Sequence, residues 1–179
     1  MAKEAFVHTR KSMAALTCSL ALASPFALAQ KAGKDDAKAL QDLAQANMAE
    51  VQVGKLASQK ARNPEVKKFA QHMIEDHGKQ LGELKKMAQA KEVTLPAAPK
   101  PKHQAAMKKL QDLSGDEFDR AYMTQMVKDH GETLTLAQKT ASQAKDDELK
   151  AAAQKAAPAI RQHLDTAQRL SGLTGAKSQ

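Results

Sequence analysis

Residues 63–88 read NPEVKKFAQHMIEDHGKQLGELKKMA, and this stretch decides the fold. Asn63, Pro64 and Glu65 are typical of a helix start, because Asn caps free backbone N–H groups, Pro fits the first helical position and an acid suits the first turn. Beyond them, residues suited to a core recur three or four positions apart: Val66, Ala70, Met73, His77, Leu81, Leu84 and Ala88. We therefore predict a helix over residues 64–92 whose inner face carries a histidine near its middle.

Three further segments repeat this stripe, and we predict helices over residues 36–62, 115–145 and 147–171. Their inner positions are Leu40, Leu43, Asn47, Glu50, Gly54, Ala57 and Ala61; Phe118, Tyr122, Met126, His130, Leu134 and Ala137; and Leu149, Ala153, Ala156, Ile160, His163, Ala167 and Leu170. Residues 93–114 form a linker that begins with a proline-rich stretch and contains a short helix from His103 to Leu113. Since prolines break helices, the linker separates two pairs of helices.

The predicted fold class is all-α, a ferritin-like four-helix bundle made of two antiparallel helical hairpins. Short loops make the helices of each pair neighbours, while the Pro-rich linker is long enough to run the length of the bundle as a crossover. Composition agrees, since the 179 residues include no Trp, one Tyr, 8 Gly and 6 Pro. β-Sandwiches and barrels depend on aromatic and β-branched side chains and on many turns, so these classes are excluded.

The N-terminus has the features of a secretory signal peptide in their usual order. A basic start is followed by an apolar run over residues 13–28, which closes on the small-residue pattern Ala27-Leu28-Ala29. We predict that residues 1–29 are cleaved and that residues 30–179 are a single domain. A retained N-terminal membrane anchor is the alternative.

Removal of this leader changes the chemistry available to the mature chain. The single cysteine, Cys18, leaves with it, so no disulfide, thiolate metal site or cysteine nucleophile is expected. Three basic residues and Glu4 leave as well, so the net charge falls from +8 to +6. Lysines alternate with acids and aromatics for base stacking are missing, so we expect no nucleic-acid partner and only weak contact with anionic envelope components. We predict an exported bacterial protein, periplasmic or associated with the outer envelope, without a transmembrane segment.

One strongly polar residue lies near the middle of each inner stripe: Glu50, His77, His130 and His163. Glu50 lies 13 residues before Asn63 and His77 lies 14 after it. At ~1.5 Å per residue, both are roughly 20 Å from the first turn. His130 and His163 likewise share a level, 16 residues before and 17 residues after Asp146. The four side chains are therefore predicted to meet inside the bundle.

A carboxylate and three imidazoles at one level predict a metal site for Zn²⁺, Cu²⁺, Fe²⁺ or Mn²⁺. Asp76 and Asp129 adjoin two of the histidines and are expected to orient them. Met73 and Met126, one turn earlier, would add soft sulfur donors or simply fill the core. The alternative is a metal-free polar network in which Glu50 is hydrogen-bonded to the histidines.

No catalytic constellation is recognisable. A ferritin-type di-iron centre needs two Glu-x-x-His motifs and two more Glu. The chain has only the reversed order at His72-x-x-Glu75, and the residue three before His130 is Val127. Motifs for a serine nucleophile or a phosphate-binding loop are missing too. We therefore predict no enzymatic activity, and we expect His72 and His103 to lie outside the site.

The chain contains an internal repeat, 53 residues apart. Phe69-x3-Met73-Ile74-x-Asp76-His77-Gly78 matches Tyr122-x3-Met126-Val127-x-Asp129-His130-Gly131. With Glu50-Val51-x2-Gly54, Gly115-x2-Phe118-Asp119 and His163, these motifs resemble a family of small exported bacterial proteins of unknown function. Members have a ferritin-like fold and are often labelled as outer membrane proteins.

This resemblance covers about residues 36–172 and implies the four-helix fold, export and recurrent Glu and His positions at Glu50, His77, His130 and His163. The third long helix is also more distantly similar to exported copper-binding His/Met bundles, which carry a His-His pair where this chain has Asp129-His130.

Two functions remain open at this point. In the first, an exported envelope protein holds a metal ion through Glu50 and the three histidines. In the second, a metal-free structural or interaction bundle presents a basic helical face to envelope partners.

Overall fold

The computed structural model describes residues 31–176, which hold five α-helices and no β-strand. Their bounds are α1 (Lys34–Lys60), α2 (Pro64–Ala90), α3 (Pro101–Gln111), α4 (Gly115–Gln143) and α5 (Asp147–Ala176). The all-α prediction is confirmed, although α5 continues past the predicted end at residue 171. The predicted signal peptide, residues 1–29, lies outside the described residues. None of the described helices is long and apolar enough to span a membrane.

The starts of α2 and α4 differ in how their first N–H groups are capped. The side chain of Asn63 accepts a hydrogen bond from the Glu65 N–H at 2.9 Å, and Pro64 stands at the first position of α2, as predicted. Ser114 stands before α4, but its side chain makes no capping hydrogen bond to the described residues. Gly115 follows with φ +57°, a left-handed conformation that glycine adopts without strain.

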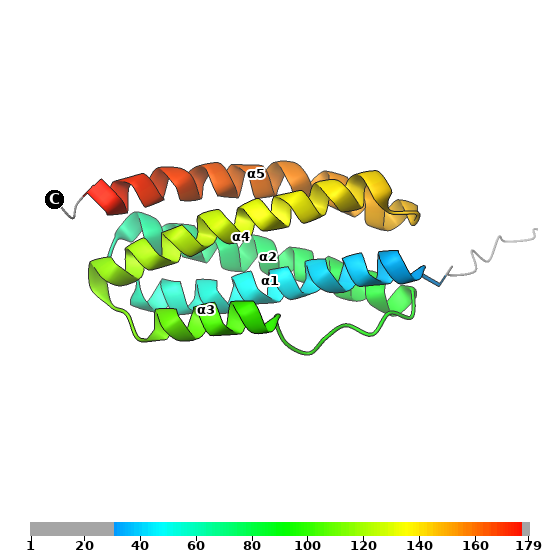
Figure 1. Ribbon diagram of the computed structural model, residues 1–179, viewed down its shortest axis with the longest axis horizontal. Coiled ribbons are helices and arrows are strands. Elements are labelled where there is room, and N and C mark those ends of the chain that lie inside the picture. Colours follow the sequence, from blue (N-terminus) through cyan, green and yellow to red (C-terminus); the bar gives the residue numbers. More distant parts are fainter. Residues whose placement is uncertain (1–30, 177–179) are drawn as a thin grey trace, which may run out of the picture.

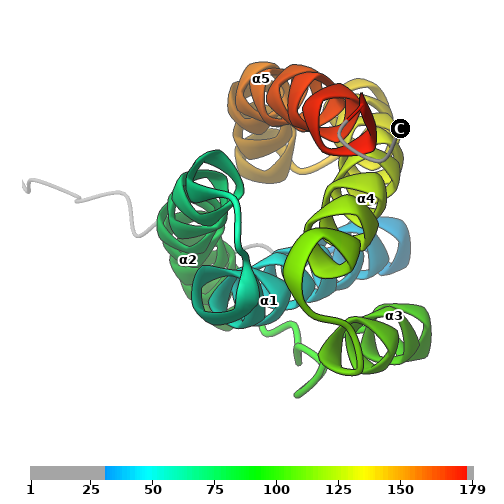
Figure 2. The ribbon, with the colours of Figure 1, turned by 90° about the vertical axis from the view of Figure 1, so that its left-hand side faces the viewer.

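Two antiparallel hairpins, α1–α2 and α4–α5, pack into a four-helix bundle (Figure 1). Viewed along its axis, the bundle has α2 beside α1 and α5 beside α4, with α3 outside the ring next to α1 and α4 (Figure 2). The crossover returns from the end of α2 to the start of α4 along the whole bundle, as its length predicts (Figure 1). The repeated segments of α2 and α4 therefore face each other diagonally across the core.

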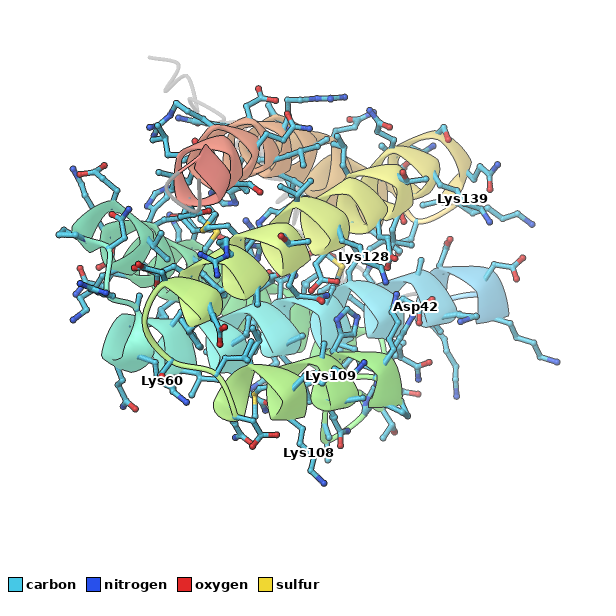
Figure 3. The ribbon with its side chains drawn as sticks, turned by 60° about the vertical axis from the view of Figure 1, so that its left-hand side comes forward. Asp42, Lys60, Lys108, Lys109, Lys128 and Lys139 are labelled. Carbon is cyan, nitrogen blue, oxygen red and sulfur yellow. The ribbon has the colours of Figure 1, made fainter. Side chains whose placement is uncertain are left out.

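Polar contacts fasten the crossover to α1. The amide groups of Gln41 and Gln45 donate to the carbonyl oxygens of Thr94 and Ala98 at 2.8 and 2.9 Å. Lys100 forms an ion pair with Asp42 at 2.9 Å. Asp42 lies on α1, and the lysines labelled on α3 and α4 lie on the outside of the molecule (Figure 3). These helices thus present solvated charge, and their inner faces remain free to pack.

Each hairpin loop is held by an aspartate from the other hairpin. Asp119, near the start of α4, accepts hydrogen bonds from the backbone N–H groups of Arg62 and Asn63 at 3.1 and 2.7 Å. Asp36, near the start of α1, accepts from the N–H groups that follow α4, at Lys145 and Asp146. Both aspartates are buried. They help to fix the two hairpins in register, because buried carboxylates here satisfy backbone N–H groups of the opposite loop.

The core is apolar towards both ends and polar in the middle. One apolar cluster packs around Phe118 and Tyr122, and another around Leu40 and Leu149. Between them the helices approach closely at Gly54, where an added Cβ would lie 3.0 Å from Ile74 Cγ1. The polar residues of the inner stripes share this middle level, which is where the sequence places them.

Candidate metal centre

Three histidines from three helices meet at the centre of the bundle. His77 comes from α2, His130 from α4 and His163 from α5, and all three are buried. One ligand nitrogen of each ring lies within 4.8 Å of those of the other two. The Nε2 atoms of His77 and His130 are 3.4 Å apart. The structure thus brings together three of the four residues that the sequence places at one level.

Asn47 fixes which nitrogen of His77 carries the proton. The Asn47 side-chain NH₂ donates to the Leu43 carbonyl oxygen at 2.9 Å, so its amide oxygen is the group that faces His77. That oxygen lies 2.8 Å from His77 Nδ1. Since an amide oxygen only accepts, His77 donates from Nδ1, and its Nε2 carries a lone pair.

His130 is fixed in the same tautomer by its own helix. Its Nδ1 donates to the Met126 carbonyl oxygen, one turn earlier, at 2.9 Å. The Nε2 atom therefore also carries a lone pair. The two Nε2 atoms that face each other at 3.4 Å are both acceptors, so no hydrogen bond joins them in the neutral state.

His163 is fixed in the opposite tautomer by an acceptor on another helix. Its Nε2 donates to Asp76 Oδ2 at 3.0 Å, which leaves Nδ1 as the acceptor. This Nδ1 is buried and has no hydrogen-bond partner within residues 31–176. Every histidine of the cluster thus donates one N–H to a carboxylate, an amide or a backbone carbonyl. That is the outer support found around metal-bound imidazoles.

The three imidazole rings of the cluster stay unprotonated on their free nitrogens at neutral pH. Burial is the main cause that lowers the pKa of each ring, and neighbouring histidines add to it, while Asp76 partly offsets the lowering of the His163 pKa. The pKa of His130 falls to about 4. All three rings are therefore neutral near pH 7, and their lone pairs remain available to a cation.

The spacing of the rings fits a tetrahedral ion. Zn–N bonds of about 2.0–2.1 Å at tetrahedral angles place two ligand nitrogens about 3.3 Å apart. The observed separation of the two Nε2 atoms is 3.4 Å. Two of the three donors thus already have the spacing of metal ligands, and the orphaned Nδ1 of His163 supplies the third.

Glu50 lies next to this cluster rather than within it. Its Oε1 is 4.0 Å from His130 Nδ1, the nitrogen turned away from the other rings. Its Oε2 is buried without a partner in the described part of the chain, as is the hydroxyl of Tyr122. Burial, together with the charge of Asp129, raises the pKa of Glu50 well above its ordinary range, which favours the neutral acid. In this structure Glu50 is a buried neighbour of His130.

The other predicted supporting residues divide into two groups. Asp76 does orient a histidine, although it is His163 of α5 rather than its neighbour in sequence. Asp129 instead accepts from Gln125 and lies 3.7 Å from His103. Met73 and Met126 belong to the apolar cluster around Tyr122, as packing residues do.

Three side chains around the site, those of Asn47, His103 and His72, make contacts that the sequence patterns do not predict. Asn47 lies on the inner stripe, where a polar residue needs a partner, and this signal was available. His103 is placed in the linker by its sequence, but its side chain is nearly buried against Asp129. His72 is exposed as expected, yet its Nε2 lies 3.3 Å from Asp76 Oδ2. The surroundings of both histidines depend on how separate helices pack against one another.

The fold and the site together define a small helical bundle with a long crossover and a buried cluster of three imidazoles. The chain belongs to the DUF4142 family, a domain of unknown function, which it matches over residues 21–170. This match confirms the part of the predicted resemblance that places the chain in a family of unknown function. The ferritin-like and outer-membrane labels stay predictions.

Two solved structures share the fold. A DUF305 fragment from Deinococcus radiodurans superposes with a TM-score of 0.70 at 14% identity, over 82% of this chain and 99% of that one. The Cu(II)-bound form of CopM superposes with a TM-score of 0.67 at 19% identity, over 76% of this chain and 95% of that one. No curated protein matches the sequence.

Proposed function

We propose that this protein binds one transition-metal ion at the centre of its bundle, through His77, His130 and His163. Glu50 stays in the proposal as the buried carboxyl group beside the site, where an anionic form would offset part of the charge of the ion. The proposal makes the protein a metal-holding module and assigns it no catalytic step.

The observation that carries the proposal is the convergence of three lone pairs with no hydrogen donor among them. Each ring has already given its N–H to an outside acceptor. Buried acceptors without partners cost free energy, about 1–3 kcal/mol each, so a fold that keeps three of them together needs a compensating ligand. A cation is that ligand. A metal-free polar network, in contrast, would pair the rings with donors.

The donor set favours Cu²⁺ or Zn²⁺ among the four ions considered. Neutral imidazoles suit both, whereas Mn²⁺ prefers oxygen ligands, and divalent affinity rises to a maximum at Cu²⁺. The solved structure of CopM, which shares the fold, is of a Cu(II)-bound form. We take Cu²⁺ as the first ion to test.

Elemental analysis and chelator competition test the proposal. We expect one Cu²⁺ or Zn²⁺ per chain, and we expect His77→Ala, His130→Ala and His163→Ala each to lose most of the affinity. His103→Ala is the matched control, because it removes a nearly buried histidine outside the cluster. A parent protein that binds neither ion, or binding that survives all three cluster substitutions, would leave the metal-free bundle as the better account.

Export of the protein is a separate part of the proposal. It is supported by the basic start, the apolar run and the Ala27-Leu28-Ala29 pattern. The intact mass of protein from the envelope fraction is expected to begin at Gln30. A mass that retains residues 1–29, or a lipid adduct on Cys18, would overturn it.

A further inference from the structure

A second group of potential ligands lies directly outside the three-histidine cluster. His72, Asp76 and His163 place one ligand atom each within 4.8 Å of one another. Asp76 Oδ2 is 3.3 Å from His72 Nε2 and 3.0 Å from His163 Nε2. Two imidazole nitrogens and a carboxylate oxygen form a donor set for the same ions as the inner cluster.

This outer group extends from solvent to the core. The His72 side chain is 54% exposed and that of Asp76 is 37% exposed, whereas that of His163 is only 3% exposed. The rings of His72 and His163 pack edge to face with their centres 5.3 Å apart. His163 belongs to both groups: its Nε2 contacts Asp76, and its Nδ1 is buried with no partner among the described residues.

The inner cluster needs such an approach because its three rings are buried. A cleft of about 210 Å³, lined mainly by α2 and α5, includes both Asp76 and Asn47 in its wall. Asn47 is the hydrogen-bond partner of His77. The wall of this cleft therefore holds one residue of the outer group, Asp76, and one direct neighbour of the inner cluster, Asn47.

From this geometry we infer that His72, Asp76 and His163 form an outer loading site, which captures a metal ion from solution and passes it to the inner cluster. The inference rests on the proposed function of that cluster.

The shared ring makes the outer site a transfer position. A neutral imidazole has one lone pair, so His163 ligates through Nε2 or through Nδ1 but not through both. While the ion is outside on Nε2, the proton of the ring is on Nδ1. When the ion moves inward to Nδ1, that nitrogen releases its proton to water, and Nε2 takes up another proton from water and donates it to Asp76. The chain thus holds one ion at equilibrium, and His72 takes part only in loading.

Rapid mixing with Cu²⁺ tests the loading role. Tyr122 is the only Tyr in a chain without Trp, so quenching of its fluorescence reports arrival of the ion. We expect His72→Ala to slow loading tenfold or more while the equilibrium affinity, from chelator competition, stays within threefold of the parent. Gln71→Ala, an exposed neighbour on the same helix, is the matched control and is expected to load at the parent rate.

The outer site is tested alone by filling the inner one with apolar side chains of similar volume. In His77→Leu/His130→Leu, checked for helical circular dichroism, we expect weak Cu²⁺ binding through two nitrogens by electron paramagnetic resonance. We expect that binding to vanish when His72→Ala is added.

The outcomes separate the two proposals. A parent that binds no Cu²⁺ overturns the proposed function. A parent that binds, together with equal loading rates for His72→Ala and Gln71→Ala, overturns the loading site and leaves the inner cluster intact. A large loss of equilibrium affinity in His72→Ala also overturns it, since His72 would then be a permanent ligand.

Discussion

Burial of His130 makes the metal-free protein sensitive to acid, and the size of the effect follows from its pKa. The pKa is about 4 in the folded protein, mainly because of burial, against an ordinary value of 6.5. Between these values the unfolded chain binds more protons than the folded one, so a fall in pH favours unfolding. The stability that the folded protein gains from a neutral His130 is present above pH 6.5 and is lost as the pH falls towards 4. From pH 7 to pH 5 this one side chain removes about 2 kcal/mol from the free energy of unfolding.

His130→Asn isolates this contribution. Asn keeps a side-chain N–H for the Met126 carbonyl oxygen but does not titrate, so its free energy of unfolding lacks the His130 contribution. We expect the parent to lose about 2 kcal/mol more than the variant between pH 7 and pH 5. His77 and His163, whose pKa values are lowered as well, titrate in both proteins, and the substitution removes only the part of the His77 shift that is due to His130.

Urea unfolding followed by circular dichroism, with a chelator present, measures the effect. Tyr122→Phe is the matched control, because it alters the same core and burial raises the pKa of Tyr122 well above its ordinary range, far from pH 5–7. We expect the free energy of unfolding of Tyr122→Phe to change with pH as that of the parent does. If the free energy of unfolding of His130→Asn also changes with pH as in the parent, His130 is not a buried neutral ring, and the argument for its free lone pair fails.

Three further substitutions test the support of the site and the packing around it. Asn47→Leu removes the acceptor that fixes the ring of His77, so Cu²⁺ affinity by chelator competition is expected to fall 10–100-fold, whereas Asn47→Asp, which keeps the acceptor, retains most of it. Gly54→Ala places a Cβ 3.0 Å from a side chain and 3.2 Å from a backbone oxygen, while Gly82→Ala meets nothing within 4 Å. Chemical unfolding should therefore show Gly54→Ala to be the less stable by about 1 kcal/mol or more, and equal stability would contradict the close helix contact. Asp119→Ala leaves two loop N–H groups without their acceptor and is expected to cost about 1–3 kcal/mol in the same assay, and an unchanged midpoint would mean that water replaces the carboxylate.

Much of the architecture could be predicted because it depends on local chemistry. Asn63 and Pro64 start α2 by capping and by a fixed φ, which neighbouring residues alone decide. Counting residues from the turns placed His77, His130 and His163 at one level, because the rise of a helix is constant. The proline-rich crossover likewise followed from its composition and length.

The contacts across helices could not be predicted in this way. Glu50 shares the level of the histidines, but whether a carboxylate points into a cluster or past it depends on helix rotation and rotamer. The structure turns it towards the outer nitrogen of His130. Asp76 contacts His163 rather than the histidine beside it in sequence, because adjacent residues on a helix point about 100° apart.

Helical periodicity and loop length are properties of a single segment, so the helices, their pairing and the depth of the histidines can be predicted from the residues alone. Which ring nitrogens are free depends on helix packing, because each tautomer is set by an acceptor in a specific place: Asn47 on another helix, the Met126 carbonyl one turn back, and Asp76 across the bundle. Hydrogen bonds act over about 3 Å, and helix packing alone brings such groups within that distance.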